Sequence, residues 1–385
     1  MKPIPYGKQF IGDEDIKAVI DVLKSDFLTQ GPKVKEFEQE FAKKTGAKYA
    51  VAVANGTAAL HLSNLAIGIS EGDKVLTTPI SFVATSNSVL FCGGEVDFVD
   101  IDSKTYTIDI AKLEQKINSA PEGTYKAIIP VDLAGYPVNM EEVKKIADKH
   151  GLKIIEDACH APGGYFIDSK GNKQTVGNCA YADLAIFSFH PVKHIAAGEG
   201  GMITTNDEGL YHKLIELRTH GVTKDPQKLT ENHGGWYYEM QSLGFNYRLS
   251  DIHSALGLSQ LRKLDKSVQR RQEIAEKYNM AFSSNPKIIT PFAAENISHA
   301  YHLYIIQVPD RKGLYDHLRQ NNIYAQVHYI PIHLQPFYRG LGWKKGDFPV
   351  AENYYEHALS LPMYPTLTEE EQNFVIEKVL EFVND

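Results

Sequence analysis

Between residues 49 and 157, one pattern recurs: a short apolar stretch, a turn and an amphipathic stretch. Repeated strand and helix units of this kind predict a mainly parallel sheet that is covered by helices on both faces. Ligands of such sheets bind at the carboxyl ends of the strands. The expected strands are residues 49–53, 74–78, 95–99, 127–131 and 153–157, and the expected helices are 81–91, 110–117 and 140–150. We therefore predict an α/β fold with its site at that edge of the sheet.

The alternation has clear limits on both sides. Two amphipathic stretches, residues 13–24 and 34–45, precede it, and a long helical pattern over residues 251–282 follows the Gly-Phe-Asn-Tyr-Arg run at 244–248. Because 385 residues exceed what one core usually holds, we expect two domains. The prediction is a large α/β domain of residues 1–250 and a smaller α+β domain of residues 251–385. The smaller domain should hold strands at 304–308 and 325–329 and helices at 313–321 and 369–382.

Charge and composition exclude several classes of protein. A net charge of −8 argues against a nonspecific nucleic-acid binder. No stretch has the apolar length of a membrane span, and the first residues lack a signal core, so we expect a cytoplasmic protein without a membrane partner. Cys92, Cys159 and Cys179 are too far apart for paired metal-binding motifs, which predicts reduced thiols.

Several catalytic motifs are absent or lie in the wrong context. A Gly-x-Ser-x-Gly match at residues 68–72 follows an expected helix and precedes an expected strand, the reverse of a hydrolase elbow. No Gly-x-Gly-x-x-Gly follows the first strand, and no phosphate-loop lysine motif occurs. His190 and His194 lie beside a proline, and His328 and His333 lack a ligand-rich helix, so we interpret them as structural or substrate contacts and predict no metal.

Lys193 is the most informative single residue. The apolar run 185–189 leads to it, and a loop with three glycines and a strand-like run follow. This order predicts that Lys193 lies at the end of a buried strand and faces a cleft. Burial disfavours the ammonium form, which makes a neutral amine available as a nucleophile toward carbonyl carbon. By itself the pattern also fits a surface lysine that ends a strand.

Three other positions fit the same chemistry. Asp157 ends an expected strand, where a carboxylate can keep a pyridine nitrogen protonated. Thr57 begins a helix after a strand and a glycine turn, an arrangement that can bind an anion. Phe82 offers a flat face for a ring. Each has an ordinary alternative, since Asp157 and Thr57 could be helix caps and Phe82 could be core. Together with Lys193 they are consistent with pyridoxal phosphate.

The chain resembles the fold-type I aminotransferases of the DegT/DnrJ/EryC1/StrS sugar aminotransferase family. The resemblance extends over nearly the whole chain. It rests on Gly-Pro at 31–32, Asn-Gly-Thr-Ala-Ala-Leu-His at 55–61, Glu-Asp-Ala-Cys-His-Ala at 156–161, Phe-Ser-Phe at 187–189 with Lys193, Gly-Glu-Gly-Gly at 198–201, residues 244–248, and Val-His-Tyr at 327–329. The implied fold is a large domain with a mainly parallel mixed sheet between helices and a smaller C-terminal α+β domain.

The resemblance also implies residue roles. Lys193 would form the internal aldimine, Asp157 would pair with the pyridine nitrogen, and Phe82 would stack on the ring. His160 would contact the ring face or its hydroxyl. The phosphate would be bound by Thr57 and Ser188, with Ala58 in the same cofactor-binding stretch. Asn246 would reach the phosphate of the neighbouring subunit's cofactor, which implies a homodimer with composite sites.

Within the family, the amino-acid sequence at residues 77–85, 325–329 and 359–362 is similar to that of members that serve pseudaminic acid biosynthesis. The implied reaction moves an amino group from L-glutamate, through pyridoxamine phosphate, to the C4 keto group of a UDP-linked 4-keto-6-deoxy-N-acetylhexosamine. Members that make 4-amino-arabinose share Phe-Ser-Phe-His at 187–190, so their reaction is the nearest alternative. Members that dehydrate carry histidine in place of the lysine, so Lys193 argues against them.

Two questions stay open at this level. Tyr6, Gln30, His328 and Tyr329 are candidates to hold the nucleotide sugar, although tyrosine and histidine also pack at domain seams. A catalytically silent, sugar-nucleotide-binding regulatory relative is the alternative of a different class. The complete pair of Lys193 and Asp157 favours the enzyme.

Overall fold

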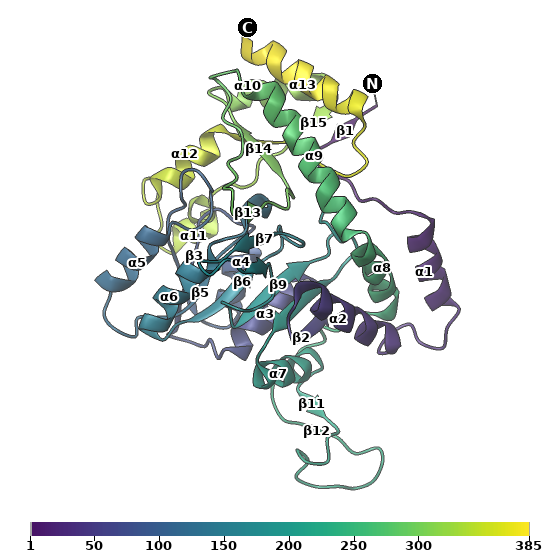
Figure 1. The fold of residues 1–385 in the computed structure, drawn as a ribbon. Coiled ribbons are helices and arrows are strands. Elements are labelled where there is room, and N and C mark those ends of the chain that lie inside the picture. The colour runs from purple at the N-terminus through teal and green to yellow at the C-terminus, as the bar shows by residue number, and fades with distance from the viewer. Residues whose placement is uncertain (1, 385) are drawn as a thin grey trace.

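A computed structural model describes residues 2–384 of the chain. Its centre is a seven-stranded sheet in the order β2-β10-β9-β6-β5-β3-β4 (Figure 1). All neighbouring strands pair in parallel except β10, which is antiparallel to both β2 and β9. The strands are β2 (Tyr49–Val53), β3 (Lys74–Thr77), β4 (Glu95–Phe98), β5 (Tyr125–Ile129), β6 (Lys153–Asp157), β9 (Leu184–Ser188) and β10 (Gly201–Thr205). The prediction of a mainly parallel α/β sheet is confirmed.

Helices cover both faces of this sheet, because alternate residues of each buried strand point to opposite sides. One face packs against α3 (Gly56–Ala66), α4 (Ala84–Phe91) and α7 (Glu208–Arg218) through residues such as Val51, Ile186 and Ile203. Strand residues of the other parity, including Ala52, Phe187 and Ile154, meet the helices on the opposite face. These are α2 (Pro32–Thr45), α5 (Ile110–Ser119), α6 (Met140–His150) and α8 (Asp251–Arg262).

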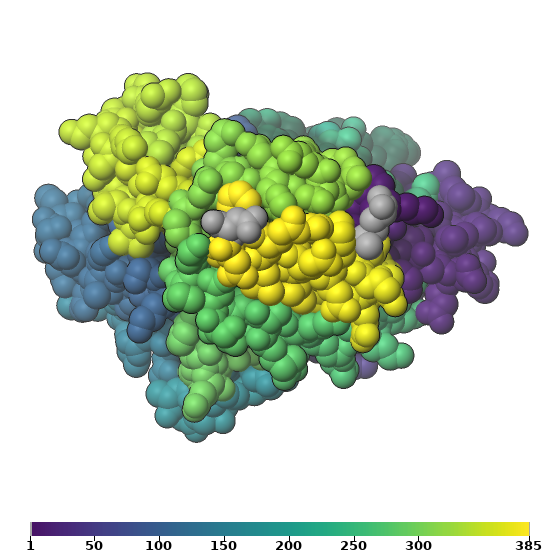
Figure 2. Space-filling view, turned by 90° about the horizontal axis from the view of Figure 1, so that it is seen from above, coloured from purple at the N-terminus to yellow at the C-terminus, as the bar shows by residue number. Residues whose placement is uncertain are grey.

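The long helix expected over residues 251–282 is two helices, α8 and α9 (Leu264–Phe282). Lys263 separates them with φ −96° and ψ −2°, so the regular hydrogen-bond ladder stops there, and its ammonium group pairs with the buried Asp15. The carboxyl-terminal half of α9 joins a second core with residues such as Tyr304 and Val379. The elements of this second core are β14 (Tyr304–Gln307), α10 (Arg311–Gln320), β16 (Ala358–Leu361) and α13 (Glu369–Asn384). Seen from above, α13 lies across this part of the molecule (Figure 2).

The beginning of the chain belongs to the second core as well. β1 (Ile4–Pro5) pairs in parallel with β15 (Ile323–Tyr324), and Ile4 is fully buried. The expected division at residues 250 and 251 stays a prediction. Smaller elements are α1 (Asp13–Leu23), β7 (Tyr165–Ile167), β8 (Lys173–Thr175), β11 (Val222–Thr223), β12 (Glu239–Met240), β13 (Ile297–Ser298), α11 (Pro336–Gly340) and α12 (Pro349–His357).

One expected element is shorter than the sequence pattern indicates, and another is absent. The helix expected at residues 81–91 begins only at Ala84, because Ser81 and Phe82 form the turn before it. The strand expected at residues 325–329 is absent: β15 ends at Tyr324, and beyond it one isolated bridge joins Gln326 to Ser360. Side-chain bonds replace a ladder there, since His328 bonds the Ser360 hydroxyl at 2.8 Å and its carbonyl accepts the Tyr354 hydroxyl at 2.6 Å.

Residues 224–238, between β11 and β12, extend away from the body below the sheet (Figure 1). Trp236 in this loop is 75% exposed. Across residues 2–384, no helix has both the length and the apolar character that crossing a membrane requires.

Candidate active site

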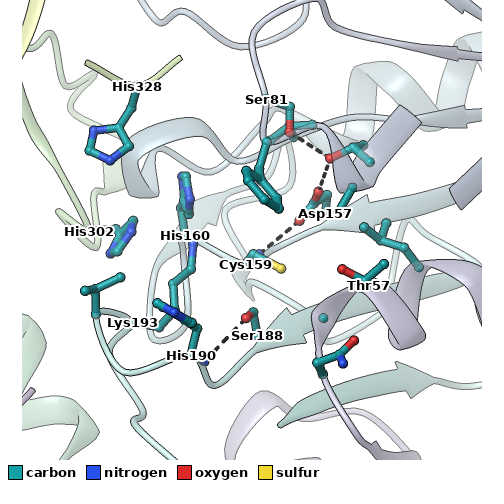
Figure 3. A pocket seen from close by; sticks show the side chains of 18 of the residues that line it. Thr57, Ser81, Asp157, Cys159, His160, Ser188, His190, Lys193, His302 and His328 are labelled. Carbon is teal, nitrogen blue, oxygen red and sulfur yellow. Dashed lines mark hydrogen bonds between the residues drawn. The ribbon is translucent and has the colours of Figure 1, made fainter. Parts of the chain in front are cut away.

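A cavity of about 450 Å³ lies at the carboxyl ends of β6 and β9. Its walls come from the start of α3, the turn before α4, the loop after β9 and the irregular segment after β15 (Figure 3). Nine sequence-predicted residues line it together: Tyr6, Thr57, Phe82, Asp157, His160, Ser188, Lys193, His328 and Tyr329. Gln30, Ala58 and Asn246 do not line it, and the side chains of Gln30 and Asn246 are exposed.

Asp157 is held in one orientation at the end of β6. The hydroxyl of Thr85 donates to its Oδ2 at 2.8 Å, and the backbone N–H of Cys159 donates to Oδ1 at 3.3 Å. Ser81 bonds the Thr85 hydroxyl at 2.7 Å. These contacts are neutral, and Asp157 is only 4% exposed, so its carboxylate can still bind a cationic N–H inside the cavity. Thr85 was not among the predicted site residues.

Lys193 lies in a turn beyond β9, which corrects the expectation that it ends the strand. β9 stops at Ser188, and Lys193 follows Pro191 in a turn closed by its own N–H, which donates to the His190 carbonyl at 2.9 Å. Its side chain nevertheless lines the cavity, as expected. Burial lowers the pKa of the amine, and the neighbouring Cys159 and Asp157 oppose that shift. A larger fraction of the amine is therefore neutral than for a lysine in water.

The start of α3 forms a cradle of backbone donors. Asn55, not Thr57, caps the helix: its Oδ1 accepts the N–H of Ala58 at 2.8 Å. The N–H groups of Gly56 and Thr57, in the first turn, have no acceptor four residues back. A Cβ on Gly56 would lie 2.9 Å from the Cβ of Ser188, so only glycine lets the helix start approach that hydroxyl so closely. The cradle suits an anion such as phosphate.

His160 is a neutral imidazole in this cavity. Burial first, and then the charges of Lys193, His328 and His194, hold its pKa well below the usual value. The N–H of Ala134 donates to Nδ1 at 3.2 Å, so the proton is on Nε2, which lies 3.2 Å from the hydroxyl oxygen of Tyr329. Burial raises the pKa of Tyr329, whose phenol therefore stays protonated.

Phe82 and His302 add two further rings to the lining of the cavity, the first exposed and the second buried. Phe82 is 58% exposed, and its ring centroid lies 6.2 Å from that of Tyr329. An exposed aromatic face at the mouth of a cavity is available to a flat ligand. His302, which was not predicted, lies 4.4 Å from the His160 ring, centroid to centroid. His302 lies in an irregular segment between β13 and β14, where the sequence carries no periodic signal that could have identified it.

The arrangement does not point to a metal centre. Across residues 2–384, no cluster of three or more His, Cys, Asp or Glu side chains is arranged to hold an ion. Cys92, Cys159 and Cys179 are free thiols. The chemistry available includes that of the Lys193 amine, the oriented Asp157 carboxylate, the neutral His160 imidazole and a helix start.

The model of the DegT/DnrJ/EryC1/StrS aminotransferase family matches residues 9–380. This chain belongs to that family.

Members of the family with similar sequences carry informative names. The chain is 40% identical to the spore coat polysaccharide biosynthesis protein SpsC of Bacillus subtilis over 99% of this chain and 97% of that one. It is 37% identical to a UDP-4-amino-4,6-dideoxy-N-acetyl-beta-L-altrosamine transaminase of Campylobacter jejuni over 97% and 95% of the two chains.

Solved structures of the family agree. Helicobacter pylori PseC, an aminotransferase involved in the biosynthesis of pseudoaminic acid, superposes with a TM-score of 0.89 at 33% identity and full coverage, 100% of both chains. A sugar aminotransferase, Spr1654 of Streptococcus pneumoniae, gives a TM-score of 0.90 at 28% identity over 99% of each chain, and that protein is known in PMP and PLP forms. The fold-type I assignment made from the sequence is confirmed.

Proposed function

We propose that this chain is a pyridoxal phosphate-dependent nucleotide-sugar aminotransferase. The proposed reaction transfers the amino group of L-glutamate to the C4 keto group of a UDP-linked 4-keto-6-deoxy-N-acetylhexosamine and yields a UDP-4-amino-4,6-dideoxy sugar. One observation carries the proposal: a single cavity brings together the Lys193 amine, the Asp157 carboxylate and the helix start beside Ser188. The Campylobacter and Helicobacter relatives support the choice of sugar.

The residues fit the cofactor. The cradle of Gly56, Thr57 and Ser188 would hold its phosphate, because a Cβ on Gly56 would crowd the very groups that bind the anion. Asp157, with neutral donors on both oxygens, would accept the N–H of the pyridinium. Phe82 would lie against one face of the ring, and the neutral His160 would face the ring or its hydroxyl. Ala58 contributes to the cradle indirectly, through its bond to Asn55.

When bound, the cofactor supplies an electron sink for the carbon that loses its proton. Lys193 supplies the base. Its Nζ, partly neutral because burial lowers its pKa, takes the proton from the α-carbon of the amino donor and later returns a proton to the sugar carbon. The Asp157 carboxylate, oriented by Thr85 and the N–H of Cys159, would face the pyridine nitrogen and favour its protonated form.

The sugar nucleotide would enter from the side of Tyr6, His328 and Tyr329. All three residues line the cavity. The Tyr6 and His328 rings lie 5.0 Å apart, centroid to centroid, and present a partly polar surface to a sugar. Gln30 and Asn246 are exposed outside this cavity, so any ligand contact they make would be in a second subunit. We therefore propose a homodimer in which Asn246 approaches the partner's cofactor phosphate, and a cytoplasmic location.

The test uses purified protein loaded with pyridoxal phosphate. Addition of L-glutamate should shift the absorbance band of the bound cofactor, and a subsequent panel of UDP-linked 4-keto sugars should restore it, with the product identified by NMR. A band that does not respond to glutamate would favour the silent regulatory relative. A product with 4-amino-4-deoxy-arabinose would favour the competing branch of the family.

A further inference from the structure

A second cavity, of about 200 Å³, lies on the other side of the Lys193 turn. Its walls come from the segment before α1, the end of α8, the first half of α9 and the loop before α13. Lys193 is the one residue that lines both cavities. Since a water molecule occupies about 30 Å³ of liquid, the space suits a molecule of several heavy atoms, not a nucleotide.

The lining of this second cavity is strongly basic. Six of its side chains are Lys or Arg, and within residues 2–384 none of the lining residues is Asp or Glu: Lys8, Lys193, Lys263, Lys266, Arg270 and Arg271. The chain as a whole carries a net charge of −8, so the charge of this cluster is opposite in sign to that of the whole chain. Like charges this close repel one another unless an anion lies between them.

Two of these six cations are already compensated, and within residues 2–384 the other four, Lys193 among them, form no ion pair. Lys263 pairs with Asp15, and Arg270 pairs with Glu273 at 3.2 Å. Among the described residues, no carboxylate forms an ion pair with Lys8, Lys266 or Arg271. Lys8 and Lys266 are exposed at the rim of the cavity. The uncompensated charge is therefore distributed around the opening and the floor.

Arg271 forms the floor and is 1% exposed. Its Nη1 donates to the carbonyls of Tyr301, His302 and Met363 at 2.9–3.2 Å. Its Nε, fully enclosed, has no acceptor within residues 2–384, and burial lowers its pKa to about 10. A buried guanidinium without an anion is costly, and a buried N–H without an acceptor adds to that cost. Both costs fall if an oxyanion occupies the cavity.

We propose that this cavity is a binding site for a small oxyanion, a free phosphate or a compact dicarboxylate, held by Lys8, Lys266 and Arg271. The site is separate from the cofactor's phosphate cradle, which lies beside α3 on the other side of Lys193. An anion bound there adds a negative charge close to the amine that carries out the proposed chemistry. Its occupancy is therefore a means of adjusting that amine from outside the substrate cavity.

Isothermal titration calorimetry on the cofactor-loaded protein tests the proposal, because the cradle is then already filled. Inorganic phosphate and succinate are titrated separately, in a chloride buffer without other oxyanions. We expect one saturable site per chain for at least one of them. If only phosphate binds, the ligand of the site is a free phosphate. If only succinate binds, the ligand is a compact dicarboxylate.

Two double variants test whether the anion binds in this cavity. Lys8→Ala/Lys266→Ala should weaken binding at least about tenfold, because it removes the two rim cations. Lys24→Ala/Lys35→Ala is the matched control: it removes two exposed lysines that lie outside the cavity, and it should bind like the parent. Equal affinity in the two double variants, or no saturable binding of either anion to the parent, would overturn the proposal. The readout does not depend on amino transfer, so it stands apart from the proposed reaction.

Discussion

The two walls of the candidate active-site cavity are built in different ways. On one wall, Asp157 and Ser188 end neighbouring parallel strands, and Thr57 lies in the first turn of a helix that follows a strand. On the other, His302, His328 and Tyr329 lie on irregular backbone and are fixed by individual side-chain bonds, such as that between His328 and Ser360. The first wall inherits its geometry from the sheet, whereas the second depends on a few separate contacts.

This difference implies a division of labour. A wall fixed by strand register can hold catalytic groups to within a fraction of an ångström, as catalysis requires. A wall of loops can vary from one relative to the next while the sheet stays the same. Substitutions in the first wall should therefore lower kcat, and substitutions in the second should mainly change KM for the sugar. The predictions below test this contrast.

The largest effect should come from Lys193→Ala. Removal of the amine eliminates the base, so the rate of amino transfer should fall at least about 1,000-fold. Single-turnover kinetics with L-glutamate measure this loss, and calorimetry with the cofactor checks that noncovalent binding is retained. Normal transfer by this variant would remove Lys193 from its proposed role.

Asp157→Asn should have the next largest effect, a loss of about 100- to 1,000-fold in kcat. The amide keeps the shape and can still accept from Thr85, but it lacks the charge that holds the pyridinium proton. Steady-state kinetics on the cofactor-loaded variant give the rate, and the thermal midpoint reports whether the fold is intact. A loaded, folded variant with near-parent kcat would contradict the electronic role.

Thr85→Val removes one donor to Asp157 without a change of volume. The carboxylate then loses the 2.8 Å bond that orients it, and we expect kcat to fall about tenfold with KM for the sugar nearly constant. Thr78→Val is the matched control, because Thr78 is an equally buried threonine whose hydroxyl donates to the Ile80 carbonyl instead. An equal loss in both variants would indicate general damage to the turn.

On the loop wall, Tyr329→Phe should raise KM for the sugar about three- to tenfold and change kcat less. The hydroxyl that is lost contacts His160 at 3.2 Å and is available to a sugar hydroxyl. Initial rates at varied sugar concentration separate the two constants. If kcat fell while KM stayed the same, the proposed division between the walls would be wrong.

The smallest effect concerns stability. Glu156, beneath the site, accepts the N–H of Gly177 at 3.1 Å, and burial raises its pKa from 4.5 to about 7. The folded state therefore holds a proton that the unfolded state releases between these two values, so stability contributed by the protonated group falls as pH rises from about 4.5 to about 7. In the Glu156→Gln variant, the fall in Tm between about pH 4.5 and about pH 7 should be smaller by a few degrees than in the parent.

Thermal midpoints of the parent and the Gln variant, measured from pH 5 to pH 8, test this expectation. Some slope should remain in the variant, because burial also raises the pKa of the neighbouring Asp132. Curves that run parallel over the whole range would show that Glu156 does not titrate there.

The contrast between the walls also explains what the sequence could predict. Strand and helix periodicity identified the sheet and its carboxyl edge, and so Asp157 and the start of α3. It began the helix at Thr57, whereas the helix begins at Gly56 after an Asn55 cap, because Asn and Thr are both good cap residues and only the backbone angles distinguish them. It also extended the strand before Lys193 and added one at 325–329, since apolar runs do not reveal where a ladder ends. Residues such as Thr85 and His302 act through contacts distant in sequence, which no local pattern encodes.

The pairing of Ile4 with Ile323 has a consequence for how the molecule forms. During synthesis, β1 emerges long before its partner β15, so the loop that this pair closes spans most of the chain. Closure of such a loop is entropically expensive and is postponed until the intervening structure has folded and brought the two segments together. We expect the sheet to assemble first, and the attachment of β1 to be the late event that completes the second core.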